Sequence, residues 1–355
     1  MLSKINFSKE HILLLHKRFP TVTESTFERT MYAFGLLQHL LKSTNGRLIF
    51  KGGTSLMLTL PFPKRVSTDI DILVGPQDNL GPAIELIEHE FPLLRLSQKT
   101  IFTKEGIRIE HYCFECPHLF AQTAHVLLDV YYGNSGYERI VGRPLANVFL
   151  ENDGLPSIVK VPSPESLLGD KMTAFAPSTI GVHPDRTSAG LVVDERLQII
   201  KQFYDIDALS SNIENFAETR RVYFKIAQEE ALLHGCPFDP EAFIEDSFKS
   251  ALSIATQGKS DRHGEYQNWF RYGIQALRDH VFAFDWTQSR AQEAAVNVMV
   301  LYACLKSGKD YGKLKNYPKS VFHERPYRAI ASAIHDPVLY AKASAAIAWF
   351  DPQAQ

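Results

Sequence analysis

Two adjacent glycines separate a short apolar segment from a run led by hydroxyl residues, and this junction restricts the possible fold more than any other feature of the chain. The apolar segment, residues 47–50, reads as a strand, and the glycines are followed by Thr54-Ser55-Leu56-Met57-Leu58. Ser and Thr favour the first turn of a helix, so a strand-to-helix turn is predicted at Gly52-Gly53. Exposed backbone N–H groups and a helix dipole at such a turn favour a bound phosphate.

Paired carboxylates follow on the next predicted strand, residues 67–74, which reads STDIDILV. Asp69 and Asp71 lie two residues apart, and residues at this spacing point to the same face of a strand. Two carboxylates this close repel each other and raise a pKa unless a cation lies between them. The simplest resolution is a divalent metal, and Mg²⁺ favours carboxylates together with substrate phosphates. Arg65, just before the pair, is a planar and permanently charged clamp for an anion.

A third acid, Asp129, interrupts the apolar run 127–131. A carboxylate in an apolar strand is costly unless it is paired, hydrogen-bonded or bound to a metal. If its strand lies beside residues 67–74, Asp129 joins the first two carboxylates. There it would hold a metal or act as general base on an attacking hydroxyl.

The predicted secondary structure changes near residue 160, from mixed strands and helices to helices. Before this point, strands are predicted at 107–114 and 125–132, and helices at 24–42, with Thr26 as one possible N-cap, and at 81–90. After it, apart from a loop near 177–190, successive helices are predicted at 194–209, 212–233, 240–256, 266–282, 287–307 and 337–350. The chain is therefore predicted to be α+β, with a mixed sheet flanked by helices in residues 1–160 and an all-α domain in residues 161–355.

The composition narrows the class of protein. The chain has 355 residues, of which 45% are hydrophobic, and its net charge is -2. The hydrophobic content excludes a largely disordered chain. The small net charge limits any nucleic-acid contact to a local patch. Four cysteines are too few for a disulfide scaffold and fit a reducing compartment. We therefore expect a cytoplasmic protein with no membrane span.

In order and chemistry, these residues resemble the motifs of nucleotidyltransferases of the DNA polymerase β type. More narrowly, they resemble the AbiEii toxin family of type IV toxin–antitoxin and phage abortive-infection systems, which serve antiviral defence. The resemblance spans residues 51–206 and rests on KGGTSL at 51–56, RVSTDIDI at 65–72, Asp129, KMTAF at 171–175 and KQFYDI at 201–206.

The resemblance implies transfer of a nucleoside monophosphate from a nucleoside triphosphate (NTP) to RNA, with the tRNA 3′ end as the favoured acceptor. It assigns Mg²⁺ to Asp69, Asp71 and Asp129. Residues implied to bind the nucleotide are Lys51, Gly52, Gly53, Thr54, Ser55, Arg65 and Lys171. In the fourth motif Asp205 would support Lys171 or the nucleotide, with Asp207 as a rival. A cognate antitoxin is also implied, and it need not bind the toxin directly.

Other functions fit the same motifs. A small molecule or a protein is an alternative acceptor, since the active site would be identical. A GTP- or ATP-binding module without turnover, or a metal-dependent phosphohydrolase, would use the same phosphate and metal groups. Cys113, Cys116 and His118 have no second pair of zinc ligands, so free thiols are predicted there. A candidate RNA patch consists of cations and aromatic rings at Lys306, Lys309, Tyr311, Lys313, Lys315, Tyr317, Lys319, Phe322, Arg325, Tyr327 and Arg328.

Overall fold

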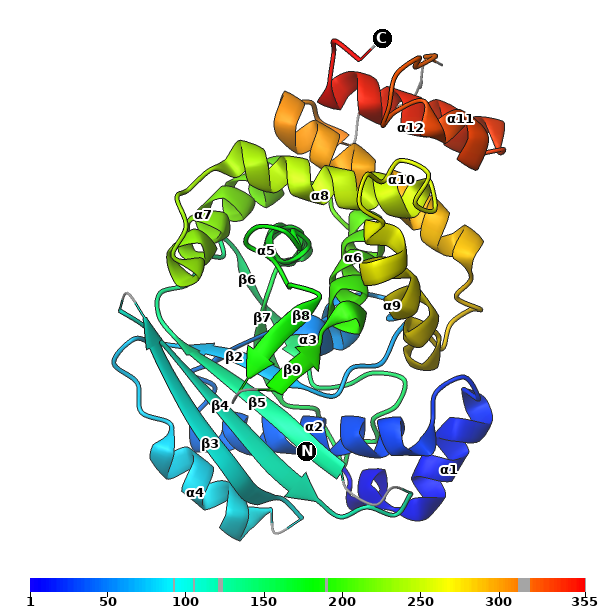
Figure 1. Ribbon diagram of the computed structural model, residues 1–355. Helices are drawn as coiled ribbons and strands as arrows, with labels where there is room; N and C mark the ends of the chain where they lie inside the picture. Colours follow the sequence, from blue (N-terminus) through cyan, green and yellow to red (C-terminus); the bar gives the residue numbers. More distant parts are fainter. Residues whose placement is uncertain (92, 105, 121–123, 189–190, 312–319, 355) are drawn as a thin grey trace. The chain divides into compact units, whose positions relative to one another are not determined.

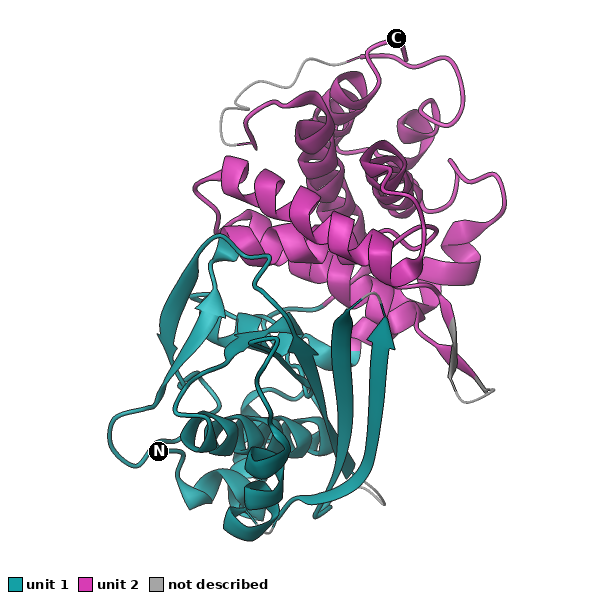
Figure 2. Cartoon of the chain, turned by 90° about the vertical axis from the view of Figure 1, so that its left-hand side faces the viewer, with its two compact units in different colours: residues 1–164, 279–285 teal, residues 165–278, 286–355 magenta. Residues whose placement is uncertain are grey.

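The computed structural model describes residues 1–355 except 92, 105, 121–123, 189–190, 312–319 and 355. The chain forms two compact units, which Figure 2 shows in separate colours. Unit 1 contains residues 1–164 and 279–285, and unit 2 contains residues 165–278 and 286–355. The segment 279–285, which the sequence places in the second domain, therefore packs with the first unit.

Unit 1 is built on a mixed sheet, which has seven strands within the described residues (Figure 1). The strands are β1 (Ile49–Lys51), β2 (Ile70–Val74), β3 (Arg95–Lys104), β4 (Ile107–Cys116), β5 (Ala124–Tyr132), β6 (Ile140–Pro144) and β7 (Ile158–Pro162). Their order across the sheet is β3-β4-β5-β2-β1-β7-β6. Strand β2 runs parallel to β5 and antiparallel to β1, so the predicted mixed sheet is confirmed.

Helices accompany this sheet as a short 3-10 turn at Lys4–Phe7 and as α1 (Lys9–Arg18), α2 (Glu24–Ser43), α3 (Gly52–Thr59) and α4 (Gly81–Glu90). Helix α2 contributes much of the core, because its Phe34 and Leu37 side chains are fully buried. Its N-cap is Thr23, whose Oγ1 accepts from the Thr26 backbone N–H at 3.2 Å. Thr26, the candidate N-cap, is therefore not the cap, because the Thr23 hydroxyl three residues earlier caps its N–H.

Strand β2 begins at Ile70, three residues later than predicted. The preceding backbone bonds instead to the segment 279–285: Val66 N–H donates to the His280 carbonyl at 2.9 Å, and Phe282 N–H donates to the Lys64 carbonyl at 3.0 Å. Asp69 therefore lies just before the strand, while Asp71 lies on it. Strands β3, β6 and β7 were not predicted.

Unit 2 is mostly helical. Its helices are α5 (Pro164–Ala174), which begins at the end of unit 1, α6 (Arg196–Ser210), α7 (Phe216–His234), α8 (Pro240–Ala255), α9 (Arg271–Ala276), α10 (Gln288–Ser307), α11 (Ala329–Ala333) and α12 (Pro337–Phe350). Helix α10 packs against α6, α8 and α12 at the centre of the unit. In the described part of the chain, no helix combines the length and apolar character needed to cross a membrane.

Two features of unit 2 depart from the sequence prediction. The predicted loop near 177–190 contains strand β8 (Asp185–Ser188), which pairs antiparallel with β9 (Leu191–Asp194), so this half is not entirely α-helical. The single helix predicted at 266–282 is divided into a π-helical turn at Tyr266–Phe270, helix α9 and a 3-10 turn at Leu277–His280. Both departures lie where Gly, Pro and polar residues weaken helical periodicity.

Candidate active site

The predicted glycine turn is present between β1 and α3, and the side chains of Asp71 and Arg65 lie close to its backbone. Gly52 has a φ of 73°, in the left-handed region that favours glycine. A Cβ at Gly52 would lie 1.9 Å from Asp71 Oδ2, and a Cβ at Gly53 would lie 2.6 Å from Arg65 Nη2. The absence of side chains at both positions therefore lets a carboxylate and a guanidinium approach the backbone of the turn.

Four side chains form a row across neighbouring strands of the sheet. Lys51 on β1 is the register partner of Asp71 on β2, and Asp71 is the partner of Asp129 on β5. Asp129 in turn pairs with His111 on β4. Register partners project from the same face of a sheet. The structure thus places Asp71 and Asp129 side by side, flanked by a lysine on one side and a histidine on the other.

Contacts at both ends of this row fix its side chains. His111 Nδ1 lies 2.7 Å from Asp129 Oδ1. The Lys51 ammonium lies 4.0 Å from the centre of the Tyr131 ring, a cation–π contact. The two carboxylates remain partly exposed. A ligand can therefore reach them without displacing the core.

Asp69 lies just before β2, next to this row, and its carboxylate forms an ion pair with Arg29. Its Oδ1 lies 3.8 Å from Arg29 Nη2 and accepts a hydrogen bond from Thr68 Oγ1 at 3.2 Å. Arg29, from α2, also donates to the His125 carbonyl at 3.0 Å. Sequence reasoning missed both Arg29 and His111. Neither residue carries a local sequence signal, because Arg29 follows the polar first turn of α2 and His111 lies within a strand.

The hydroxyls predicted to bind phosphate are used within the turn. Thr54 Oγ1 donates to the Asp69 carbonyl at 2.5 Å, and Ser55 Oγ donates to the Gly52 carbonyl at 2.8 Å. Both residues are buried. In this structure they therefore stabilise the turn and tie it to Asp69. Arg65, also buried, donates from Nη1 to the Val66 carbonyl at 3.2 Å.

The carboxylates fit a magnesium ion that arrives together with a nucleotide. Among the described residues, no three His, Cys, Asp or Glu side chains gather as a ready set of metal ligands. Asp71 and Asp129 are nevertheless register neighbours, and Mg²⁺ is usually held by one or two carboxylates plus substrate phosphates. The donor set present in this chain therefore suits Mg²⁺ with a triphosphate better than a permanently bound metal.

Lys171 and Asp205 form a buried ion pair within unit 2. The Lys171 ammonium lies 3.2 Å from Asp205 Oδ2 and donates to Gln202 Oε1 at 2.8 Å. Both charged residues are less than 10% exposed, at 6% and 1%. Asp207 instead accepts from Asn297 Nδ2 at 2.7 Å. Of the two rival acids, Asp205 is thus the one beside Lys171, while a role for this pair in nucleotide binding stays a prediction.

Two further groups of candidate residues are the cysteines and the candidate RNA patch. The four cysteines all lie in the described residues and carry free thiols. Part of the candidate RNA patch, including Lys313, Lys315, Tyr317 and Lys319, lies outside the described residues. In the described part of the patch, Lys306 lies 3.5 Å from Glu241 and Lys309 lies 4.8 Å from the centre of the Trp349 ring.

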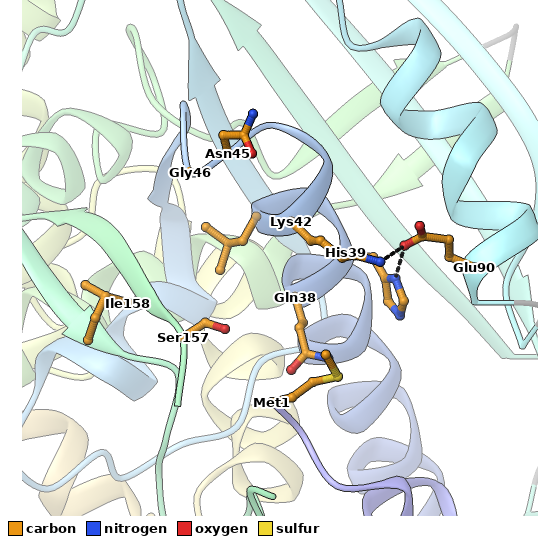
Figure 3. A pocket seen from close by; sticks show the side chains of 10 residues that line it. Met1, Gln38, His39, Lys42, Asn45, Gly46, Glu90, Ser157 and Ile158 are labelled. Carbon is orange, nitrogen blue, oxygen red and sulfur yellow. Dashed lines mark hydrogen bonds and ion pairs between the residues drawn. The ribbon is translucent and has the colours of Figure 1, made fainter. Parts of the chain in front are cut away.

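A cavity of about 650 Å³ lies at the end of α2, and Figure 3 shows its lining. The Glu90 carboxylate is contacted there by Lys42 Nζ at 2.8 Å and by His39 Nδ1 at 3.6 Å. Burial lowers the pKa of His39, although Glu90 opposes this effect. No predicted site residue lines the cavity in the described structure. The charges inside it satisfy one another, so we assign it no function.

A mixed sheet with a glycine turn before its acid-bearing strand, and with a second carboxylate on the adjacent strand, is the arrangement of the nucleotidyltransferase class of α+β proteins. The family model described as nucleotidyl transferase AbiEii toxin, type IV toxin–antitoxin system, matches residues 36–290. The match covers more than half of the chain, and the chain belongs to this family. The resemblance inferred from the motifs is thereby confirmed.

Comparison with solved structures adds a distant similarity. The crystal structure of JHP933 from Helicobacter pylori is 11% identical in sequence, and the match covers 79% of this chain and 95% of that chain with a TM-score of 0.41. No curated protein matches the chain.

Proposed function

We propose that this protein transfers a nucleoside monophosphate from an NTP to an RNA acceptor, with the tRNA 3′ end as the favoured target, in a Mg²⁺-dependent reaction. The observation that carries the proposal is the side-by-side placement of Asp71 and Asp129, with the Asp71 carboxylate against the Gly52 turn. Membership of a nucleotidyltransferase toxin family supports the reaction class.

The reaction is an in-line displacement at the α-phosphorus. The acceptor hydroxyl oxygen forms a new bond to phosphorus, the bond to pyrophosphate breaks, and the hydroxyl proton passes to a carboxylate such as Asp129. Positioning and charge neutralisation supply most of the rate enhancement in such transfers. When bound, Mg²⁺ would supply neutralisation of the phosphate charge. His111 keeps the Asp129 carboxylate oriented, and Arg65 adds positive charge at the turn.

The test is incubation of the protein with total RNA, Mg²⁺ and each α-³²P-labelled NTP in turn. Asp129→Asn and Asp69→Ala are compared with Asp153→Asn, which changes an exposed acid in the same unit. We expect label in tRNA-sized RNA, a loss of at least about 100-fold in Asp129→Asn, and full activity in the control.

Other outcomes would contradict the proposal in distinguishable ways. Pyrophosphate release without labelled RNA indicates a small-molecule or protein acceptor. Saturable NTP binding without release of any product indicates a binding module. Inorganic phosphate in place of pyrophosphate indicates a phosphohydrolase.

We further propose that RNA modification in the cytoplasm causes toxicity, and that a cognate antitoxin opposes it. Family membership supports this proposal, because the family is described as the toxin of a type IV system. Growth arrest on expression should disappear in Asp129→Asn. Growth arrest that persists in this variant would separate toxicity from nucleotidyl transfer.

A further inference from the structure

A second cavity, of about 330 Å³, lies within unit 2. It is lined by residues of α8, by the polar loop 260–265 and by the π-helical turn Tyr266–Phe270. In the described structure none of the predicted catalytic or nucleotide-binding residues lines it. Its volume is near the lower end of the range for small-molecule sites and suits one nucleoside.

The wall of the cavity carries two hydrogen-bonding groups with different roles. Ser253 is 4% exposed, and within the described residues its Oγ has no hydrogen-bond partner. A buried hydroxyl without a partner is unfavourable, so a ligand that bonds to it gains affinity. The Asp246 carboxylate is oriented by Ser178 N–H at 2.8 Å and Thr179 Oγ1 at 2.9 Å. Burial raises the pKa of Asp246, and these hydrogen bonds only partly oppose that effect.

An aromatic ring and cations complete the lining. Trp269 is partly exposed and stands edge-on to Phe270, with ring centres 6.1 Å apart and an interplanar angle of 88°. Arg262, Lys249 and His263 are exposed and also line the cavity. A flat aromatic face beside cations suits a stacked base with its phosphate.

The remaining acids of the cavity are engaged with the loop backbone. Asp261 Oδ2 accepts from Tyr266 N–H at 2.7 Å, and Glu265 Oε2 accepts from His263 N–H at 3.2 Å. Lys249 forms an ion pair with Glu245 one helical turn earlier. Arg262 is therefore the cation that we assign to an incoming phosphate. The π-helical turn that adjoins the polar loop is a feature often found at functional sites. A ligand site in this cavity would account for both the loop and the turn.

We propose that this cavity binds one nucleotide of a single-stranded RNA, with the base stacked on Trp269, its polar edge on Ser253 and Asp246, and its phosphate near Arg262. The inference rests on the proposed function for the choice of RNA, and it deepens that function by giving the acceptor a binding site in unit 2.

Tryptophan fluorescence tests the proposal in the full-length protein carrying Asp129→Asn, so that bound RNA is not modified. The chain has three tryptophans, Trp269, Trp286 and Trp349. We expect a single-stranded RNA of about ten nucleotides to quench fluorescence saturably, and Trp269→Phe to abolish the quenching while Trp349→Phe retains it. Because stacking is worth about 1–3 kcal/mol per base, Trp269→Ala should raise Kd by about 5- to 150-fold.

Charge is tested separately by fluorescence anisotropy of labelled RNA. Arg262→Ala should weaken binding and reduce the slope of log K against log salt by about one charge. Arg290→Ala is the matched control, because Arg290 is exposed on the same unit and pairs with Glu293 at 3.7 Å. Melting temperatures within about 2 °C of the parent show that each variant is folded.

Several results would overturn the site. These are an unchanged Kd in folded Trp269→Ala, quenching that survives in Trp269→Phe, or equal quenching by a free NTP, which would make it a mononucleotide site. The proposed function fails separately from this inference. If RNA is labelled and the KM for RNA is unchanged in Trp269→Ala, the cavity is not the acceptor site but the proposed function stands. If RNA binding depends on Trp269 but no RNA is labelled, the cavity binds RNA but the proposed function fails.

Discussion

Gly52 combines two constraints that separate substitutions can distinguish. A non-glycine residue at its φ of 73° costs about 1–2 kcal/mol, and an added Cβ would also displace the Asp71 carboxylate. We therefore expect Gly52→Ala to lose at least about 100-fold in nucleotidyl transfer, since displacement of a reacting group by about 1 Å has effects of this size. The labelled-NTP assay and a thermal melt measure the two effects.

Gly46 is the matched control for this substitution. It has a similar φ of 68°, but a Cβ there would meet no atom within 4 Å. Gly46→Ala should thus lose the same about 1–2 kcal/mol of stability and keep its activity. Equal losses of activity in the two variants would show that crowding of Asp71 is not the cause.

The burial of the Lys171–Asp205 pair should make unit 2 sensitive to the loss of either partner. Removing one partner of a buried ion pair typically costs about 3–5 kcal/mol, because the other charge remains buried without it. We expect Lys171→Met and Asp205→Leu each to destabilise the protein by this amount in urea denaturation. The double variant should be more stable than the sum of the two losses predicts. Simple additivity would mean that the two charges do not interact.

At the scale of elements, local patterns predicted the strands that carry the acids, but not the edge strands β3 and β6 or the strand β7 beside β6. Strand β3 reads RLSQKTIFTK and is almost fully exposed, so it lacks the apolar alternation that identifies a strand. Strand β6 is short and contains Gly142 and Pro144. The start of β2 could not be predicted either, because the partner of Val66 is His280, more than 200 positions away in the sequence.

The same distinction holds for the candidate site. The Gly52 turn and the spacing of Asp69 and Asp71 are local, so the sequence was sufficient to identify them. His111 and Arg29 depend on the register of β4 against β5 and on the packing of α2 near the sheet. No spacing within the chain encodes those two neighbours. A sequence therefore identifies candidate reacting groups more readily than the neighbours that contact them.

Strands β4 and β5 and the edge strand β3 together hold a buried carboxylate whose ionisation should affect stability. Burial alone would raise the pKa of Glu110, but hydrogen bonds from Tyr112, Arg108 and Tyr132, with help from Lys99, lower it below its ordinary value of 4.5. Because the folded-state pKa is the lower one, the stabilisation is present above pH 4.5 and is lost as the pH falls through the folded-state value.

Urea denaturation between about pH 7 and pH 3 measures this contribution. Glu110→Gln should be less stable than the parent at pH 7, and the difference should shrink on acidification. Lys99→Met, which removes the more distant cation at 3.5 Å, should have a smaller effect of the same sign. A constant difference between Glu110→Gln and the parent over the whole range would show that the carboxylate charge is not responsible.

At the scale of the whole molecule, unit 1 is completed by a segment from far along the chain. Residues 279–285 interrupt the sequence of unit 2 and pack with the first 164 residues. Val281 forms an antiparallel backbone bridge with Arg65. The Val281 carbonyl also accepts a hydrogen bond from Thr21 Oγ1 at 2.8 Å. The segment thus supports the residues that lead into the acid-bearing strand.

Phe282 anchors this segment, with its ring 5.1 Å from Phe19 and 4.9 Å from Phe149, both measured between ring centres. Because Phe282 is only partly buried, Phe282→Ala should cost about 2 kcal/mol, less than a typical Phe→Ala change in a core. Hydrogen exchange should locate the loss, with faster exchange at the amides of Val66 and Phe282 and unchanged exchange at Met299 in the core of unit 2. Phe238→Ala, at an exposed position of unit 2, should leave all three amides unchanged. If Val66 stays fully protected in Phe282→Ala, the segment is held by its backbone bonds alone, and the acid-bearing strand does not depend on the aromatic anchor.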